Sequence, residues 1–173
     1  MNKILIKNIG ELLTGKDGSL EILHDKELLI SDGKIESAGN TGEFSEEGCE
    51  IIDAENSLVT PGLVDPHTHL IFFGTREDEF EMRIKGASYM EIAGSGGGIR
   101  KSVRMLREAS EDDLVEHSLP YLKNMLKYGT TTVEVKSGYG LSLKDELKSL
   151  RAIKRLDEMS KIDLVPTFLG AHE

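Results

Sequence analysis

The chain of 173 residues has one cysteine and lacks any long apolar segment. Cys49 has no partner for an internal disulfide, which fits a reducing compartment. Residues 1–15 lack the apolar core of a signal peptide, and no apolar run approaches the ~18 residues that a membrane span needs. These absences predict a soluble protein of the cytoplasm.

Positive charge is scarce as well. Lys and Arg number 21 against 31 Asp and Glu, which leaves a formal net charge of −10. Nucleic acids and anionic membranes are both bound through basic surfaces. We therefore expect neither as a partner. With 38% hydrophobic and 30% charged residues, the composition is that of an ordinary globular protein.

Common nucleotide-binding and nucleophile motifs are also missing. The glycine-rich run 94–98 does not fit G-x-G-x-x-G, because its third glycine would fall at Ile99 and no strand directly precedes it. There is no G-x-x-x-x-G-K-[ST] loop, and no Ser or Cys has a recognisable partner base. The glycine run is more typical of a mobile lid or of a close backbone approach to a ligand.

The pattern along the chain changes near residue 60. Residues 1–60 are rich in short strands and turns, which predicts a small antiparallel β domain. Asp32-Gly33 between two apolar strands indicates a type I′ hairpin. Strands are expected at 3–8, 20–24, 27–31, 34–38 and 50–53.

Residues 61–173 instead alternate strands with helices, which predicts a parallel sheet with right-handed crossovers. A long connection covers 70–98. Ser110 and Ser142 are expected to cap helices, and Pro120 is expected to kink or split one. Strands are expected at 63–69, 130–136 and 162–169, and helices at 101–109, 112–128 and from 143 to about 159.

Only three parallel strands are expected after Pro61, whereas a (β/α)₈ barrel needs about 250 residues. The third strand ends close to the end of the chain. We therefore expect an α/β protein that is the N-terminal part of a longer enzyme. Residues 1–60 would form a small β-sandwich-type segment, and residues 61–173 the first three strands of an incomplete TIM-like barrel. A complete small three-stranded α/β domain is the alternative.

His67-Thr68-His69 is the most informative motif. Side chains two apart on a strand share a face, so both imidazoles can point at one spot. That arrangement suits a divalent metal such as zinc or iron. Asp65 shares the face and is a candidate to orient one ring. The alternative is two solvated histidines in a loop.

Two further candidates follow the other strand ends. In parallel α/β folds the functional site forms at the carboxyl ends of the strands. Tyr139 lies in the loop after the second strand of this part, and His172 closes the third. A single His or Tyr at a strand end is more often packed or solvated than functional, but their shared edge indicates a common pocket with the histidine pair.

Side chains in the connection 70–98 are more ambiguous. Arg76 could clamp a carboxylate through a bidentate contact. A surface ion pair with Glu77 or Asp78 is the simpler interpretation of this arginine alone. Tyr89 is equally consistent with packing.

Three arginines, Arg100, Arg104 and Arg107, share one helix face. Because the chain is strongly acidic overall, we interpret this face as a solvated one. His24 and His117 have no sequence context that indicates a function.

The segment PGLVDPHTH (61–69) resembles the first barrel strand of the amidohydrolase superfamily, and ISDGKI (30–35) resembles the β segment that precedes that barrel. Within the superfamily the closer resemblance is to the imidazolonepropionase family. It covers essentially the whole chain, and KSGYG and GAHE are its most specific parts. The stretches that carry it are DPHTHL (65–70), GTR (74–76), GSGGGI (94–99), GTTTVEVKSGYG (129–140) and TFLGAHE (167–173).

The resemblance implies a (β/α)₈ barrel with one zinc or iron ion and a small β domain. It implies hydrolysis of 4-imidazolone-5-propanoate to N-formimidoyl-L-glutamate, a step of histidine degradation. Arg76 would bind the propionate carboxylate, and the ring or product would contact the loops after the second and third strands. The implied site residues are the metal ligands His67 and His69, the substrate-binding residues Arg76, Tyr139, His172 and Tyr89, and His172 as a catalytic residue.

The resemblance places the remaining ligands and the acidic general base beyond residue 173. Catalytic zinc usually has about three protein ligands, so we expect the 173-residue chain alone to bind metal weakly and to lack hydrolase activity. The open strand edge favours self-association, and we expect a homo-oligomer. Another cyclic amidase or aminohydrolase of the superfamily, or a non-catalytic binding module, are the alternatives.

Overall fold

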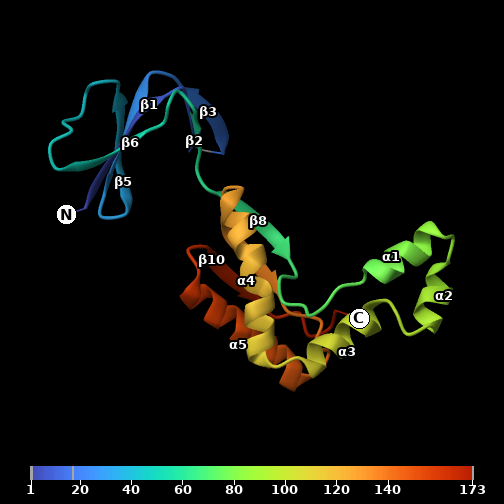
Figure 1. Ribbon diagram of the computed structural model, residues 1–173. Coiled ribbons are helices and arrows are strands. Elements are labelled where there is room, and N and C mark those ends of the chain that lie inside the picture. Colours follow the sequence, from blue (N-terminus) through green and yellow to red (C-terminus); the bar gives the residue numbers. More distant parts are fainter. Residues whose placement is uncertain (1, 17, 173) are drawn as a thin grey trace. The chain divides into compact units, whose positions relative to one another are not determined.

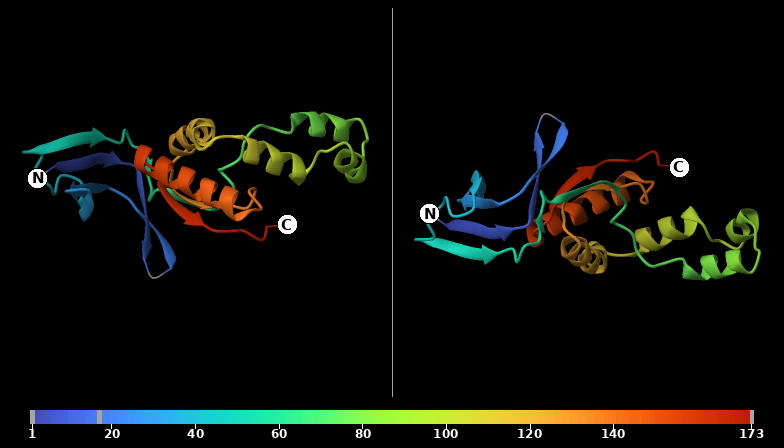
Figure 2. Two further views of the ribbon diagram at one scale, coloured as in Figure 1. Left: turned by 90° about the horizontal axis from the view of Figure 1, so that it is seen from below. Right: turned by 90° about the horizontal axis from the view of Figure 1, so that it is seen from above.

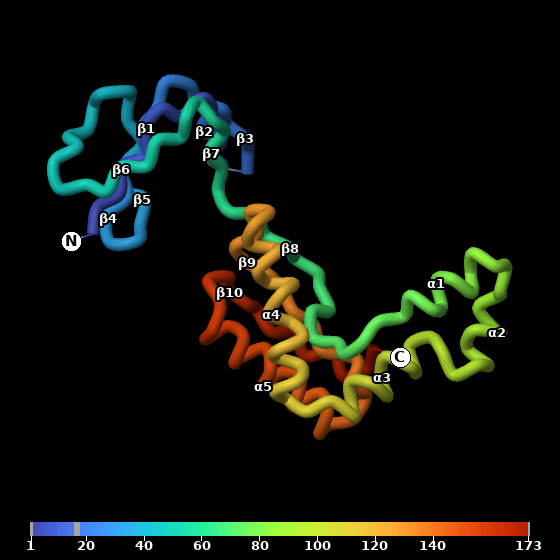
Figure 3. Tube along the Cα trace, in the orientation of Figure 1, coloured from blue at the N-terminus to red at the C-terminus, as the bar shows by residue number. Residues whose placement is uncertain are grey.

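The computed structural model describes residues 2–16 and 18–172 and divides into two compact units, Met1–Pro61 and Gly62–Glu173. The described part of the first unit consists of strands and turns, and the second alternates strands with helices (Figures 1 and 3). The change of pattern along the chain therefore coincides with a change of architecture.

The first unit contains two sheets with the strand orders β5-β4-β1-β6 and β3-β2-β7. Ile9, Leu12 and Leu28 form a small buried cluster to which strands of both sheets contribute. The strands are β1 (Lys3–Ile9), β2 (Glu11–Lys16), β3 (Ser19–Leu23), β4 (Lys26–Ser31), β5 (Lys34–Asn40), β6 (Cys49–Asp53) and β7 (Leu58–Val59).

The predicted hairpin is confirmed in the first unit. β4 and β5 pair antiparallel, and both turn residues, Asp32 and Gly33, have positive φ angles of 50° and 78°, as a type I′ turn requires. The prediction of an antiparallel domain is wrong in part, because β1–β6 and β2–β7 pair parallel. Apolar alternation defines a strand's faces, but it says nothing about the direction of a neighbour that is distant in sequence.

The second unit is built on a three-stranded parallel sheet of order β10-β9-β8, as the alternation of strands and helices predicts. The carboxyl ends of all three strands therefore lie at one edge. The elements are β8 (Leu63–Thr68), α1 (Glu77–Ile84), α2 (Tyr89–Gly94), α3 (Ile99–Glu108), α4 (Glu111–Lys127), β9 (Thr130–Lys136), α5 (Leu143–Met159) and β10 (Asp163–Thr167).

Helices α4 and α5 cover one face of this sheet (Figures 1 and 2). Val133 and Val135 of β9 are buried in one core with Leu106 of α3, Leu122 of α4 and Leu156 of α5. Because side chains alternate along a strand, Glu134 and its neighbours two residues away lie on the opposite face. The core thus fixes which β9 side chains remain available to a site.

Several helix predictions need correction. The connection 70–98 contains two short helices, α1 and α2, which extend away from the sheet (Figures 1 and 2). Both span only 8 and 6 residues, which is too short for an apolar period to reveal them. Pro120 lies inside α4 without splitting it, and Leu114 and Leu122 on either side are buried. Packing on the sheet therefore outweighs the local cost of the proline.

Candidate active site

Three rings meet at the carboxyl edge of the parallel sheet. His69 follows β8, Tyr139 follows β9 and His172 follows β10. The rings of His69 and His172 stack with centroids 4.5 Å apart and an interplanar angle of 12°. The Tyr139 ring lies 5.1 Å from His69 and 5.4 Å from His172. Sheet topology therefore brings together residues that are far apart in the chain.

His67 lies beside this cluster, with its ring centroid 5.8 Å from that of His69. His67 is exposed and His69 is half-buried. Asp65 Oδ1 accepts a hydrogen bond of 3.3 Å from the backbone N–H of His67. Asp65 therefore holds the strand end rather than an imidazole ring, which corrects the expected ring-orienting contact.

The His69 ring is the more unusual of the pair. Its Nδ1 is buried, and none of the described residues is a hydrogen-bond partner of this atom. Burial lowers the pKa of His69, and the nearby His172 and His67 add to that effect. The neutral ring therefore presents a lone pair, as a metal ligand must.

His172 contacts the backbone of the loop that carries Tyr139. Its Nδ1 lies 3.1 Å from the carbonyl oxygen of Gly138. A carbonyl only accepts, so in the neutral ring Nδ1 carries the proton and Nε2 carries the lone pair. Gly138 has φ +118°, and a Cβ there would lie 2.9 Å from that Nδ1. Glycine is therefore required for this close approach.

Glu146 is a site residue that the sequence pattern did not reveal. The residue is 1% exposed, and its carboxylate accepts 2.8 Å hydrogen bonds from the backbone N–H groups of Gly138 and Leu141. The only available signal was its place directly after the predicted cap Ser142-x-x-Asp145. That cap is confirmed, since Ser142 Oγ accepts from Asp145 N.

A second group that the pattern did not reveal lies on the sheet face opposite the core. Glu134 Oε1 accepts hydrogen bonds from Lys136 Nζ at 2.5 Å and from Thr167 Oγ1 at 2.7 Å. These contacts, led by Lys136, lower the pKa of Glu134. Thr68 Oγ1 donates to the Glu134 carbonyl at 2.7 Å, so polar contacts link all three strands.

Arg76 and Tyr89 lie at the starts of helices α1 and α2, not at the carboxyl edge of the sheet. Arg76 is the N-cap residue of α1, and its Nε lies 4.0 Å from Glu79 Oε2. Its predicted surface partners were Glu77 and Asp78, so the pairing is with a residue further along the first turn of the helix. Tyr89 is the first residue of α2 and is 62% exposed. Within the described ranges, no aromatic contact joins Tyr89 to the ring cluster.

The glycine-rich run between α2 and α3 is held by a buried carboxylate. Glu79 is 6% exposed, and its Oε1 accepts a 2.9 Å hydrogen bond from Gly98 N. A Cβ on Gly97 would lie 3.0 Å from the same oxygen. The close backbone approach anticipated for this run is thus an approach to Glu79 of the chain itself.

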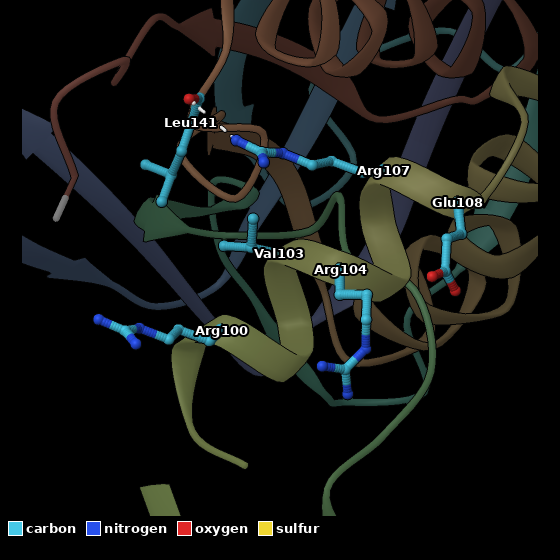
Figure 4. Close-up of a pocket in the computed structure, with 6 residues that line it drawn as sticks. All are labelled: Arg100, Val103, Arg104, Arg107, Glu108 and Leu141. Carbon is cyan, nitrogen blue, oxygen red and sulfur yellow. Dashed lines mark hydrogen bonds between the residues drawn. The ribbon is translucent and has the colours of Figure 1, made fainter. Parts of the chain in front are cut away.

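The arginines of α3 do not form one uniform solvated face. Arg107 Nε donates to Gly140 O at 2.7 Å and its Nη2 to Leu141 O at 3.0 Å. Figure 4 shows Arg107 reaching Leu141 while Arg100 and Arg104 point in other directions. These side chains line a surface hollow of about 440 Å³ together with Val103 and Glu108.

The two histidines do not form a complete metal site by themselves. Residues 2–16 and 18–172 contain no group of three or more His, Cys, Asp or Glu side chains placed to hold one metal ion. Over the same residues, none of the helices combines the length and the apolar character that a membrane crossing requires.

Several known proteins resemble this chain in sequence or in fold. A family model described as "Amidohydrolase family" matches residues 50–126. An imidazolonepropionase of Bacillus velezensis is 49% identical over 97% of this chain and 42% of its own length. A triazine hydrolase variant has a TM-score of 0.67 at 20% identity, covering 97% of this chain and 36% of the solved one. Atrazine chlorohydrolase from Arthrobacter aurescens, solved with zinc, has a TM-score of 0.63 at 21% identity. That match covers 95% of this chain and 35% of the solved one.

These matches show similarity to the amidohydrolase family model over residues 50–126 and a fold shared with the solved structures over at least 95% of the chain. Its sequence is similar to proteins named imidazolonepropionase over almost every residue it contains. The chain spans 42% to 45% of the length of two such relatives, from Bacillus velezensis and a Geobacillus species.

Proposed function

We propose that residues 61–173 supply the first three strands of a (β/α)₈ barrel and that residues 1–60 supply a β-sandwich-type segment before it. The parallel order β10-β9-β8 with helices on one face supports the first part. A buried cluster with contributions from two sheets supports the second. The solved relatives share this fold over at least 95% of the chain.

The assembled barrel hydrolyses 4-imidazolone-5-propanoate to N-formimidoyl-L-glutamate. The observation that carries this proposal is the cluster of His69, Tyr139 and His172 in a chain 49% identical to an imidazolonepropionase. In the reaction one water molecule is added and one C–N bond of the cyclic amide is broken.

One zinc or iron ion would be held by His67 and His69. Their rings emerge side by side at a strand end, and the buried Nδ1 of His69 lacks a protein partner among the described residues. Two imidazoles at one strand end suit either metal, so these residues fit the ion. When bound, such an ion polarises a carbonyl and provides a nucleophile at neutral pH.

The protein's own groups orient the substrate. His172 Nε2, which carries the lone pair when Nδ1 donates to Gly138, can accept a hydrogen bond from a ring N–H. Tyr139 supplies a flat apolar wall and a hydroxyl beside both histidines. Arg76 binds the propionate carboxylate, and Tyr89 lines the pocket from α2. The Arg76 side chain is 44% exposed, so it remains available to an anionic ligand.

The test is an assay of the purified protein, expressed from its complete reading frame, for consumption of 4-imidazolone-5-propanoate in the presence of zinc or iron. We expect turnover that disappears on chelation and returns with metal. Absence of turnover in folded, metal-loaded protein would overturn the proposal. Turnover of other cyclic amides but not of this substrate would favour a different hydrolase of the superfamily.

The remaining proposals concern the state of the protein. The 173 residues alone lack turnover because they contribute two metal-binding histidines where about three protein ligands are usual. The protein is cytoplasmic and forms a homo-oligomer. Light scattering of the purified protein tests the last point, and a monomer at all concentrations would contradict it.

A further inference from the structure

The loop Ser137–Leu141 carries Tyr139 and is held from inside by a buried charge. Glu146 uses both carboxylate oxygens on this loop, one for Gly138 N and one for Leu141 N. A buried carboxylate with two backbone donors makes charge-assisted hydrogen bonds, which are stronger than neutral ones. A Cβ on Gly140 would lie 2.6 Å from Glu146 N, so the loop is also packed tightly against α5.

The same loop is held from outside by α3. Arg107 donates to the carbonyls of Gly140 and Leu141, so a cation satisfies the acceptors while Glu146 satisfies the donors. Lys148 anchors the end of α3 through the carbonyls of Leu106, Arg107 and Ala109. Glu146 and Arg107 therefore bind opposite sides of the short backbone segment Ser137–Leu141.

A single residue, Gly138, connects these loop contacts to the rings of the site. Gly138 donates its N–H to Glu146, and its carbonyl accepts from His172 Nδ1. Movement of that loop would displace the acceptor that fixes the His172 tautomer and would also move the Tyr139 ring. Neither Glu146 nor Arg107 makes a hydrogen bond to any of the three rings within residues 2–16 and 18–172.

We propose that Glu146 and Arg107 are positioning residues that hold the Ser137–Leu141 loop and thereby set the tautomer of His172 and the place of Tyr139. The effect on catalysis rests on the proposed function, whereas the effect on the loop does not. Loss of either grip should leave the sheet intact, because the loop lies beyond the carboxyl end of β9.

The first experiment measures the order of the Ser137–Leu141 loop and does not depend on catalytic activity. In metal-free protein labelled with ¹⁵N, long-range ¹H–¹⁵N spectra at about pH 8 show which nitrogen of a neutral histidine carries the proton. Amide hydrogen exchange reports on Gly138 and Leu141. We expect an Nδ1–H tautomer at His172 and slow exchange. In Glu146→Gln, one amide loses its acceptor, exchange accelerates roughly tenfold, and the tautomers mix.

Matched controls lie on the same helices. Glu158→Gln changes an exposed carboxylate of α5, and Arg104→Lys changes an exposed arginine of α3 that points away from the loop (Figure 4). Both should match the wild type. Arg107→Lys keeps the charge but cannot span two carbonyls as the guanidinium does, so it should loosen the loop even if Glu146→Gln fails to fold. Unchanged exchange and tautomer in folded Glu146→Gln or Arg107→Lys would overturn the proposal.

The second experiment measures catalysis by the protein from the complete reading frame. A misplaced ring should lower kcat by about 10–100-fold with a smaller change in KM, because Arg76 still binds the carboxylate. A variant with a loosened loop but wild-type kcat would overturn the catalytic part. If the wild type itself shows no turnover, the proposed function fails, and the spectra still decide whether these residues position the loop.

Discussion

The segments that follow β8 and β9 hold their side chains in opposite ways. After β9, Ser137 is 2% exposed, and the amides of Gly138 and Leu141 both donate to the buried carboxylate of Glu146. After β8, the chain forms two short helices on which Phe80, Tyr89 and Met90 are 62% to 75% exposed. One segment is preorganised and the other leaves its surface open.

Under the proposed function, this difference assigns separate roles to the two segments. A site that stabilises a transition state benefits from groups fixed before the substrate arrives, which is the condition of Tyr139 and His172. Arg76 lies on the open segment, where under the proposed function it would adjust to a flexible propionate arm. We therefore expect substitutions near β9 to act on kcat and substitutions near α1 to act on KM.

Replacement of a metal ligand should have the largest effect. His69→Ala removes one of two imidazoles and should lower kcat/KM by more than the roughly 10–100-fold that loss of a metal ligand's hydrogen-bond partner costs. Zinc content after gel filtration should fall in parallel. His24→Ala, at an exposed position between β3 and β4, is the control. Full activity and metal content in His69→Ala would exclude this histidine as a ligand.

Arg76→Ala tests the open segment. Loss of a charged hydrogen-bonded pair with the propionate should raise KM roughly 10–100-fold, while kcat changes little. Arg83→Ala removes a neighbouring positive charge from α1 and separates a specific clamp from general attraction. Equal effects of the two substitutions, or a fall in kcat alone, would place the carboxylate elsewhere.

The sheet edge could be predicted from sequence because strand periodicity and parallel order together fix which ends meet. His69, Tyr139 and His172 are brought together by that rule alone. Asp65 shows its limit, since sharing a face with His67 did not predict whether it would bind ring or backbone.

The supporting groups could not be predicted for a physical reason. Glu146 and Arg107 act on backbone atoms, and no residue pattern in the loop reveals which distant side chain will satisfy its amides. A net charge of −10 also suggested that all three arginines of α3 are solvated, but one of them found carbonyl partners. Global charge does not determine local pairing.

Substitution of one glycine in each segment compares how tightly the two segments are packed. Gly138 and Gly96 both have positive φ, at 118° and 86°, but of the two only Gly138 has neighbours within 4 Å of an added Cβ, namely atoms of His172. Gly96→Ala should cost about 1–2 kcal/mol for the backbone conformation. Gly138→Ala should cost about 1–3 kcal/mol more, because His172 must move. Urea unfolding measures the free energy of unfolding of both variants. Equal losses would show that the loop after β9 can rearrange to accommodate the added methyl group.

The capping boxes of α2 and α4 provide the smallest contrast. Ser88 with Glu91 and Ser110 with Asp113 make the same reciprocal contacts. Ser110→Ala should lower global stability by about 0.5–2 kcal/mol. Ser88→Ala should instead speed hydrogen exchange in α2 alone, because that short helix buries little of its surface. A global loss in both variants would mean that the open segment unfolds with the core.

Acid should weaken both boxes in the same direction. The Ser110 hydroxyl and backbone N–H lower the pKa of Asp113, and the Ser88 N–H and hydroxyl lower that of Glu91. Because the pKa of each carboxyl group is lower in the folded than in the unfolded chain, its ionised form stabilises the folded state. This contribution is complete above the ordinary pKa values of 3.8 for Asp113 and 4.5 for Glu91, and it is lost as the pH falls through the folded pKa. The difference between wild type and Ser110→Ala should therefore shrink below about pH 4. A difference that stays constant down to about pH 2 would show that the carboxylate of Asp113 contributes nothing and that the hydroxyl alone caps α4.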